Sequence, residues 1–365
     1  MSDTYRAAGV NYEVLDRAKR AAIEQATATS ALLANHGGRA LDASRGEPAF
    51  VYTLGDRTFA FVLECLGTKS VLARHYLEAT GADHFADVAY DTVAAIVNDL
   101  ACPGALPLVV NAYFATGSDS FFSDGARLNS LVEGWRRACE DAGATWGGGE
   151  SPTLAGLVSA EDVELAGSAV GVMPEGRTPL LGEELAPGNE IVLIASTGLH
   201  ANGASLVRVV ADDAPDGLNT NLPDGHSLGA AALTPSLIYV PLVAALADTD
   251  IPVTYMTHIT GHGLRKLMRP ANALSYRITD LPDVPPVLNF LVERLAMDAR
   301  AAFGTFNMGA GFAVYCDADG GDRVVETAGA LGMEALVAGV VEEGPRRVIL
   351  EPVDVTYEAE DLELR

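Results

Sequence analysis

The apolar positions in the first half of the chain follow two alternating periods. Strand-like runs flank the turn at Gly55-Asp56, and later segments show the three-to-four-residue spacing of helices that bury one face. The elements predicted from this pattern are two strands within 48–67, a helix over 84–101, a strand over 106–117, a helix over 124–143, a short strand entering a glycine loop at 144–150, and a strand over 162–174.

A second series of elements follows a stretch rich in Gly, Pro and Glu at 175–190, which is typical of a domain boundary. Strands mixed with helices and hairpins favour α+β domains over a regular doubly wound sheet. We therefore expect an N-terminal domain, residues 1–174, and a C-terminal domain, residues 175–365. The elements predicted for the second half are a strand at 190–196, a helix from Ala204, a strand at 251–259, a helix from Leu264 and a strand at 311–317, with 212–229 as a surface loop.

Composition narrows the class of protein. With 49% hydrophobic and 20% charged residues, the 365-residue chain has a globular composition. Its net charge of −25 repels nucleic acid, so we expect no nucleic-acid partner. No apolar run is long enough to span a bilayer, and the N-terminus lacks the apolar core of a signal peptide, which predicts a cytoplasmic protein without membrane contact. The four cysteines form no C-x-x-C pair, so we expect neither a zinc site nor a disulfide framework.

The predicted helix at 84–101 carries acidic and amide side chains among apolar residues. Asp91 and Asp99 are eight residues apart, about 12 Å along a helix. Asn98 is seven residues from Asp91, so these two lie on one face. Oxygen ligands that face a common pocket suit Mg²⁺. The alternative interpretation, equally open on spacing alone, is that Asp91 caps a helix and Asn98-Asp99 caps its C-terminal end.

Two glycine-containing segments of the first half are candidates for binding a phosphate or a nucleotide. Gly67-Thr68-Lys69 places a flexible backbone, a hydroxyl and a cation in succession, and Glu64 adds a carboxylate nearby. The glycines at 147–149 allow a ligand to approach the backbone, and Glu150 offers a carboxylate. An ordinary hairpin end and a tight surface turn are the alternative interpretations of these segments.

Three loops of the second half carry further candidates. The helix that begins near Asn202-Gly203 exposes free N–H groups, and His200 beside it is a candidate acid or base. Thr260-Gly261 precedes Arg265 and Lys266, a positive cluster suited to a phosphate monoester. Asn307 lies in a glycine loop that leads into a strand. The alternative interpretations are that His200 is merely exposed, and that Arg265 and Lys266 form a basic helix face that balances the negative surface.

The order of these segments along the chain is more specific than any one of them. The chain resembles the family of aminoimidazole ribonucleotide synthase, also called phosphoribosylformylglycinamidine cyclo-ligase, from about residue 5 to 350. The segments that carry the resemblance are Tyr5 with "AAGV" (7–10), "GTK" (67–69), "VNDL" (97–100), "YFATG" (113–117), "GGGE" (147–150), "LAGSAVGV" (165–172), "STGLHANGASLVR" (196–208), "HITGHG" (258–263) and "TFNMGAG" (305–311).

The resemblance implies a two-domain fold in which the N-terminal sheet pairs with its copy in a homodimer and the C-terminal domain is an α/β sandwich. It implies ring closure of formylglycinamidine ribonucleotide in purine biosynthesis, with ATP and Mg²⁺ and a phosphorylated small-molecule substrate. Carried over by position, the residues it implies are Glu64, Gly67, Thr68, Lys69, Asn98, Gly148 and Glu150 for ATP, His200, Asn202, Thr260, Gly261, Gly263 and Asn307 for substrate, Asp91, Asp99 and Glu64 for metal, and His200, Lys69 and Asp99 for catalysis.

The chain departs from the family pattern at a few positions. Where the family usually has Thr-Asp-Gly-Val-Gly-Thr-Lys, this chain has Leu63-Glu64-Cys65-Leu66-Gly67-Thr68-Lys69, and His262 stands where glycine is common. Two other functions therefore stay open. One is another ATP-dependent reaction of the superfamily, such as that of thiamine-monophosphate kinase or selenophosphate synthetase, and the other is nucleotide or partner binding without turnover. The absence of a cysteine before Cys65 speaks against selenophosphate synthetase.

Overall fold

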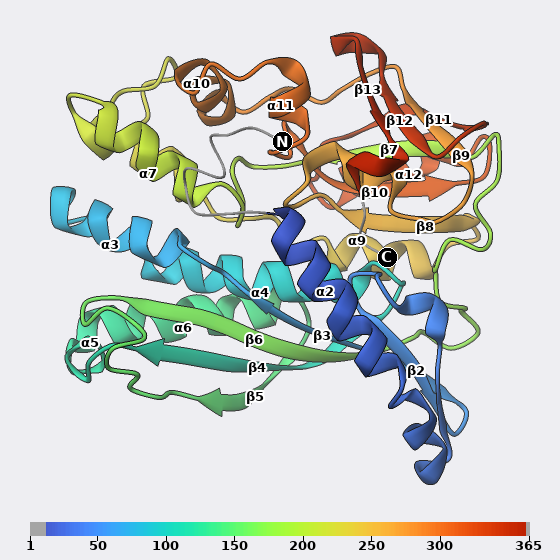
Figure 1. Ribbon diagram of the computed structural model, residues 1–365, viewed down its shortest axis with the longest axis horizontal. Coiled ribbons are helices and arrows are strands. Elements are labelled where there is room, and N and C mark those ends of the chain that lie inside the picture. The colour runs from blue at the N-terminus through green and yellow to red at the C-terminus, as the bar shows by residue number, and fades with distance from the viewer. Residues whose placement is uncertain (1–11, 363–365) are drawn as a thin grey trace.

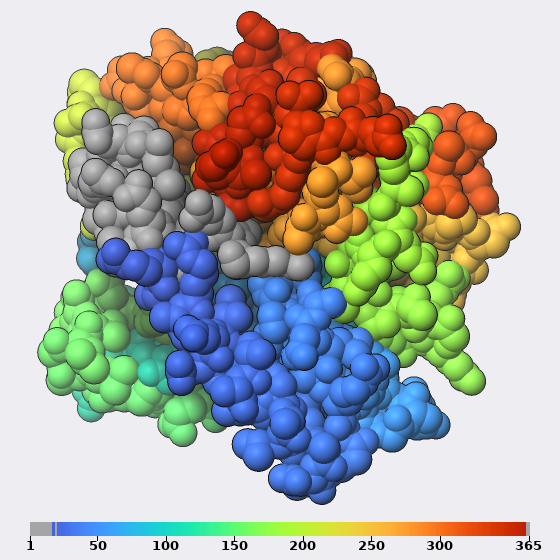
Figure 2. All heavy atoms as spheres, turned by 45° about the vertical axis from the view of Figure 1, so that its right-hand side comes forward, coloured from blue at the N-terminus to red at the C-terminus, as the bar shows by residue number. Residues whose placement is uncertain are grey.

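Two sheets organise the chain, one in each half (Figure 1). The computed structural model describes residues 12–362, so the predicted motif around Tyr5 and 7–10 lies outside the described residues. The expected mixed α and β fold is confirmed. Figure 2 shows the blue and green first half below the orange and red second half, with a light-green connecting segment along one side. Among residues 12–362, no helix has the length and apolar character needed to cross a membrane.

The first sheet has six strands within the described residues, in the order β1-β2-β3-β6-β4-β5, and all neighbours are antiparallel except β4 and β5. Its strands are β1 (Gly38–Ala40), β2 (Phe50–Leu54), β3 (Arg57–Cys65), β4 (Leu106–Thr116), β5 (Thr145–Glu150) and β6 (Val163–Val172). The helices of this half are α2 (Tyr12–Thr27), η1 (Ser30–His36), η2 (Asp42–Ser44), α3 (Lys69–Thr80), α4 (Phe85–Ala101), α5 (Ser120–Ser123) and α6 (Gly125–Asp141).

The second sheet, in the second half, has seven strands among residues 12–362. Their order is β13-β12-β9-β11-β7-β10-β8, and β12 and β9 are parallel. Its strands are β7 (Glu190–Ala195), β8 (Val253–His258), β9 (Leu274–Ile278), β10 (Ala310–Cys316), β11 (Ala335–Glu343), β12 (Arg347–Leu350) and β13 (Val355–Glu358). The helices are α7 (Ala204–Asp213), η3 (Gly217–Asn219), α8 (Leu228–Ala232), α9 (Val240–Ala247), η4 (Gly263–Met268), α10 (Pro286–Arg294), α11 (Ala299–Phe303), α12 (Gly321–Ala330), η5 (Glu351–Val353) and η6 (Ala359–Asp361).

Helix α4 lies between the first sheet and the second half (Figure 1). It packs on β3, β4 and β6 and also contacts α9 and β8. A helix covered on both sides must be apolar nearly all round, and its sequence meets this requirement with buried residues such as Val93, Ile96 and Val97. The polar residues Asp91, Asn98 and Asp99 are buried as well, so each needs a partner from the surrounding structure.

The other face of the first sheet has a row of apolar residues that no described element covers fully. Along β3, Ala60 and Val62 are buried, whereas Phe61 and Leu63 on the opposite face are 43% and 69% exposed. The strand register aligns Phe61 with Phe50 on one side and Val170 on the other. Residues that are directly opposite in an antiparallel pair share a face, so this surface is continuous across three strands.

Three predicted elements differ from the structure. The segment 212–229, predicted as a surface loop, contains η3 and the start of α8, and its leucines Leu218, Leu222 and Leu228 are buried. The segment from Leu264, predicted to begin a helix, is a 3-10 helix that ends at Met268, because Pro270 has no N–H to continue a helix. The glycines at 147–149, predicted as a loop, belong to edge strand β5, where Gly149 must stay small because a Cβ would lie 2.1 Å from the Ala112 carbonyl oxygen.

Candidate functional site

A cavity of about 290 Å³ lies where the two halves meet. Its wall combines the end of β3 and the last turns of α4 with loops of the second half. The lining residues are Glu47, Pro48, Glu64, Cys65, Leu66, Ala95 and Asp99 from the first half, and Ala201, Asn202, His258, Thr260, Gly261, His262, Lys266 and Arg269 from the second. The predicted site residues Glu64, Asp99, Asn202, Thr260 and Gly261 are thus brought together.

The buried carboxylate of Asp99 has a partner from the second half. Asp99 Oδ1 lies 2.7 Å from His258 Nδ1, at the end of β8. Burial alone would raise the pKa of the Asp99 carboxyl, but the hydrogen bond with His258 and the charges of Lys266 and Arg269 outweigh burial and lower it. Asp99 is therefore ionised, and it holds one ring nitrogen of His258 in place.

Lys266 supplies a titratable cation to the same cavity. Burial disfavours its ammonium form and lowers its pKa to about 8. Its Nζ contacts the Thr260 hydroxyl, which also lines the cavity. Arg269, in contrast, is held against the first half, since its guanidinium donates to the Gly46 carbonyl oxygen at 2.9 and 3.0 Å. Lys266 is therefore the cation best placed to meet an anionic ligand.

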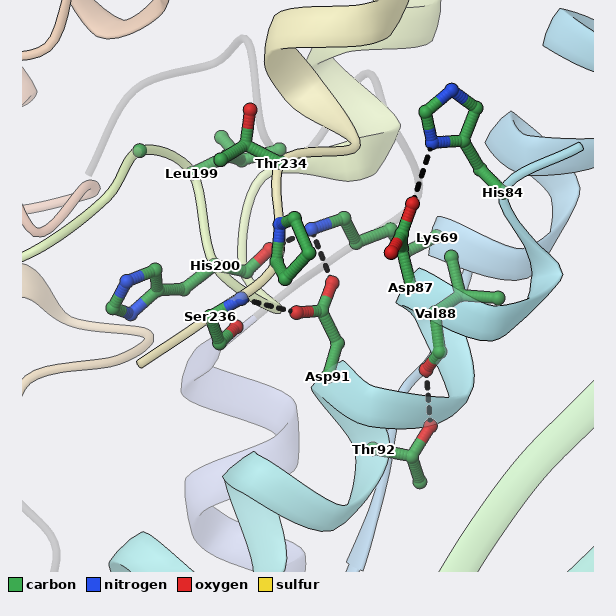
Figure 3. Close-up of polar contacts among 12 residues, drawn as sticks. Lys69, His84, Asp87, Val88, Asp91, Thr92, Leu199, His200, Thr234 and Ser236 are labelled. Atoms are coloured by element: carbon green, nitrogen blue, oxygen red, sulfur yellow. Dashed lines mark hydrogen bonds and ion pairs between the residues drawn. The ribbon is translucent and has the colours of Figure 1, made fainter. Parts of the chain in front are cut away.

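Lys69 and Asp91 form a separate buried ion pair, shown in Figure 3. Lys69 Nζ also donates to the His200 carbonyl oxygen at 2.8 Å, and Asp91 Oδ1 accepts the Ser236 N–H at 2.6 Å. Both side chains are fully buried. Lys69, Asp91 and the neighbouring Gly67 and Thr68 do not line the cavity, so in this arrangement the pair joins the first half to two loops of the second.

Three more predicted site residues shape backbone loops. Asn98 donates to the Leu237 carbonyl oxygen and accepts the Tyr239 N–H, each at 2.8 Å. Asn307 donates to the Gly198 carbonyl oxygen at 2.8 Å and accepts the Gly309 N–H at 3.0 Å. These contacts use both ends of each amide.

Gly263 has a positive φ of 54° and lies so near the Phe303 carbonyl oxygen that a Cβ would be 2.1 Å away. Asn98, Asn307 and Gly263 therefore hold the loops around the site, but they do not line the cavity.

His200 is placed differently from the prediction. Its Nε2 accepts the Thr197 N–H at 3.2 Å, its ring is buried, and it does not line the cavity. Burial lowers the pKa of His200 well below the usual value for histidine. The ring is therefore neutral, with the lone pair of Nε2 already used.

Gly148 and Glu150 are also away from the cavity wall. Both lie on edge strand β5 and are exposed. Glu150 Oε1 accepts the N–H of Ser151 at 3.1 Å, a local contact within the chain. Their nucleotide-binding role stays a prediction.

The three carboxylates predicted to hold a metal do not form a common ion site. Asp91 is neutralised by Lys69 and is outside the cavity, whereas Glu64 and Asp99 line it. Across residues 12–362, no three His, Cys, Asp or Glu side chains are grouped so that they could hold a metal ion. A magnesium ion bound jointly by Glu64, Asp91 and Asp99 therefore does not fit this structure, because an ammonium already serves as the counter-charge of Asp91.

Two family models match the chain. The AIR synthase related protein N-terminal domain matches residues 46–173, and the AIR synthase related protein C-terminal domain matches residues 186–351. This chain belongs to the AIR synthase family. A phosphoribosylformylglycinamidine cyclo-ligase of Alkaliphilus oremlandii is 30% identical over 96% of this chain and 100% of its own. The protein of the same name from Methanocaldococcus jannaschii is 29% identical over 93% of this chain and 92% of its own.

Solved structures with the same fold carry other names. The E. coli hydrogenase maturation protein HypE aligns with a TM-score of 0.59 and 18% identity over 83% of this chain and 85% of its own. Thiamine monophosphate kinase from Aquifex aeolicus aligns with a TM-score of 0.56 and 14% identity over 82% of this chain and 90% of its own. At such identities the likeness shows the AIR synthase fold alone.

Sequence reasoning missed one central residue of this AIR synthase family member. His258 begins the motif "HITGHG", but only the residues after it were given a role. The available signal was its position at the end of a predicted strand directly before a glycine loop. Its partner Asp99 is 159 residues away in the sequence, so local sequence pattern could not predict the contact between the two side chains.

Proposed function

We propose that this chain closes the imidazole ring of 5-aminoimidazole ribonucleotide from formylglycinamidine ribonucleotide, consuming ATP and releasing ADP and phosphate. The observation that carries the proposal is full-length similarity to a protein named for this reaction, which covers 96% of this chain and 100% of the relative. A chain that matched only one domain would support the fold but not the activity.

The chemistry of the proposed reaction sets what the cavity must do. ATP supplies a phosphoryl group that turns the formamide oxygen into a good leaving group. The chain must hold the phosphorylated substrate, position the amidine nitrogen and accept a proton as the ring closes. Lys266 with the Thr260 hydroxyl is suited to an anionic oxygen of the substrate, and Asn202 and Gly261 lie on the same wall.

The remaining residues keep narrower assignments. We propose that Glu64 at the cavity wall lies near the nucleotide, while Gly67, Thr68, Gly148 and Glu150 stay predicted nucleotide contacts. Mg²⁺ enters the proposal only as the ion that accompanies ATP, and no protein carboxylate is assigned to it. A reaction that consumes ATP and builds a small metabolite also fits the cytoplasmic location that we propose.

One assay tests the proposal. The purified protein is incubated with ATP, Mg²⁺ and formylglycinamidine ribonucleotide, and ADP and a diazotisable aminoimidazole are measured. We expect both products in equal amounts, with little ADP when the substrate is left out. Phosphorylation of thiamine monophosphate instead would support a kinase of the same fold, and ATP binding without any product would support a binding protein. Either result refutes the cyclo-ligase proposal.

We further propose that the exposed face of the first sheet pairs with a second copy of this chain. The face is apolar and aromatic, with Tyr52 stacked between Phe50 and Phe59 at centroid distances of 5.8 and 5.7 Å. Contiguous exposed apolar surface of this kind marks an interaction site. In a two-fold contact the same face of both copies meets, so this one face would be covered on each chain.

Light scattering coupled to size exclusion tests the dimer. We expect the unmodified chain to elute as a dimer and Leu63→Glu as a monomer. The matched control is Leu331→Glu, because Leu331 is also an exposed leucine, 42% exposed, but lies in the second half. An unmodified chain that is monomeric, or a dimer that survives Leu63→Glu, would disprove the pairing.

A further inference from the structure

Three histidines lie at or beside the cavity, and they differ in what their ring nitrogens can do. Nε2 of His200 is already an acceptor for a backbone N–H, and His200 does not line the cavity. His262 lines the cavity and has a positive φ of 75°. His258 lines the cavity and has a carboxylate bound to one nitrogen. A carboxylate bound to one nitrogen fixes both the tautomer and the direction of the His258 ring.

The Asp99–His258 contact determines which nitrogen carries the proton. Asp99 is ionised and can only accept hydrogen bonds, so Nδ1 of His258, 2.7 Å away, is the donor. Nε2 then has a free lone pair in the neutral ring. Because Nδ1 is committed to α4, Nε2 is the ring nitrogen left for a ligand in the cavity that His258 lines.

The ring of His258 is also held by packing. It packs beside the stacked rings of Tyr239 and Phe312, which are 5.1 Å apart, and its centroid is 6.4 Å from each. Its backbone is fixed in the sheet by pairing of β8 with β10. A base held by a carboxylate and packed against a pair of aromatic rings needs little reorganisation to accept a proton.

The charged and titratable groups around His258 come from each element that packs on it. The carboxylate of Asp99 from α4 contacts the ring, and the cations Lys266 and Arg269 line the same cavity. The other titratable groups that face it or share its cavity are Cys102 after α4, His200 before α7, Glu64 and Cys65 at the end of β3, Glu47, His262 and the phenol of Tyr239. Cys102 and Tyr239 stay neutral because burial raises their pKa values.

We propose that His258 is the general base of ring closure and that Asp99 is its positioning residue. This assignment rests on the cyclo-ligase reaction proposed above and names the group that moves its proton. As the amidine nitrogen attacks, the new N–C bond forms and the bond between that carbon and the phosphorylated oxygen breaks. The electron pair leaves with the phosphate, and the proton of the attacking nitrogen passes to Nε2 of His258. The imidazolium is stabilised by the carboxylate of Asp99.

Steady-state kinetics of two variants test the assignment. His258→Gln keeps an N–H that can meet Asp99, and we expect its kcat to fall by about 10²–10⁴ with KM within a few-fold of the unmodified value. Asp99→Asn presents an amide N–H to Nδ1 and so favours the tautomer with the proton on Nε2. We expect it to lower kcat at least about tenfold and to move the acidic limb of the kcat profile to lower pH.

Chemical rescue separates a missing base from a damaged fold. In His258→Ala, imidazole added to the buffer should restore part of kcat, because the cavity of about 290 Å³ has room for it. The matched control is His84→Gln. The His84 Nδ1–Asp87 Oδ2 contact is also 2.7 Å, but this pair is at the start of α4 and away from the cavity (Figure 3). We expect His84→Gln to keep the unmodified kcat.

The outcomes distinguish this assignment from the proposed function. An unmodified chain that forms no aminoimidazole refutes the proposed function, and the role of His258 falls with it. An active chain in which His258→Gln keeps its kcat, or in which imidazole fails to rescue folded His258→Ala, overturns the assignment alone. NMR signals of the His258 ring, identified by their loss in His258→Gln, should shift when substrate is added, and unshifted signals at saturating substrate would also overturn it.

Discussion

The buried Lys69–Asp91 pair predicts a large loss of stability on a small chemical change. Asp91→Asn keeps the shape of the side chain but removes its charge, so the fully buried ammonium of Lys69 keeps only neutral partners. Removing one partner of a buried ion pair costs about 3–5 kcal/mol. With an unfolding entropy of about 2.1 cal/mol/K per residue over 365 residues, the melting temperature should fall by about 4–7 °C. Calorimetry of the purified variant measures this shift.

Two controls define what the shift means. Replacing both partners, as in Lys69→Met with Asp91→Leu, should recover most of the lost stability, because no buried charge is left unpaired. Asp250→Asn breaks the exposed contact with Arg323 and should leave the melting temperature nearly unchanged, because solvent screens this pair. An Asp91→Asn protein that melts within about 1 °C of the unmodified chain would refute the reasoning. If the double variant is stable but inactive, the Lys69–Asp91 pair also takes part in the reaction, as the sequence predicts.

Three further predictions concern single positions. Because the pKa of Lys266 is about 8, KM for the anionic substrate should rise as the pH increases through about 8, and Lys266→Met should remove this dependence in steady-state kinetics. Gly263→Ala should destabilise the fold by about 2–5 kcal/mol in urea titrations, since its Cβ meets a carbonyl oxygen, whereas Gly81→Ala, also at positive φ but in open space, should cost about 1–2 kcal/mol. The folded pKa of Asp99 is below its ordinary value of 3.8, so its stabilisation is present above that value and lost as the pH falls through the lower, folded pKa. Asp99→Asn should therefore show a weaker loss of stability in acid than the unmodified chain, measured by urea titrations at successive pH values.

Local pattern was enough to predict most elements that contain a strong period. The helix predicted at 84–101 is α4, Phe85–Ala101, and the helix predicted from Ala204 begins at Ala204. The hairpin around Gly55-Asp56 forms β2 and β3. In each case the apolar spacing and the turn residues agree with the final packing. The segment after Leu264 was predicted less well, because a short buried run before a proline does not distinguish an α-helix from a 3-10 helix.

The candidate site was predicted only in part, because its contacts join distant parts of the sequence. Spacing placed Asp91 and Asn98 on one face of a helix, and that face does meet the second half, at Ser236, Leu237 and Tyr239. The spacing could not identify the partners. A carboxylate satisfied by a lysine and one prepared for a metal have the same local sequence pattern, and only the tertiary contacts separate them.

Helix α4 therefore links the stability of the chain to its chemistry. Asp91 and Asn98 bind backbone and side-chain groups that join the two halves, and Asp99, the residue after Asn98, orients His258 at the cavity. A displacement of α4 relative to the second sheet would weaken the contacts between the two halves. It would also disturb the orientation of His258, because the same rigid helix carries both sets of contacts. Loss of activity in an α4 variant consequently identifies a chemical role only if the melting temperature is unchanged. His258 lies on the neighbouring strand, so a substitution there separates a loss of chemistry from a loss of stability.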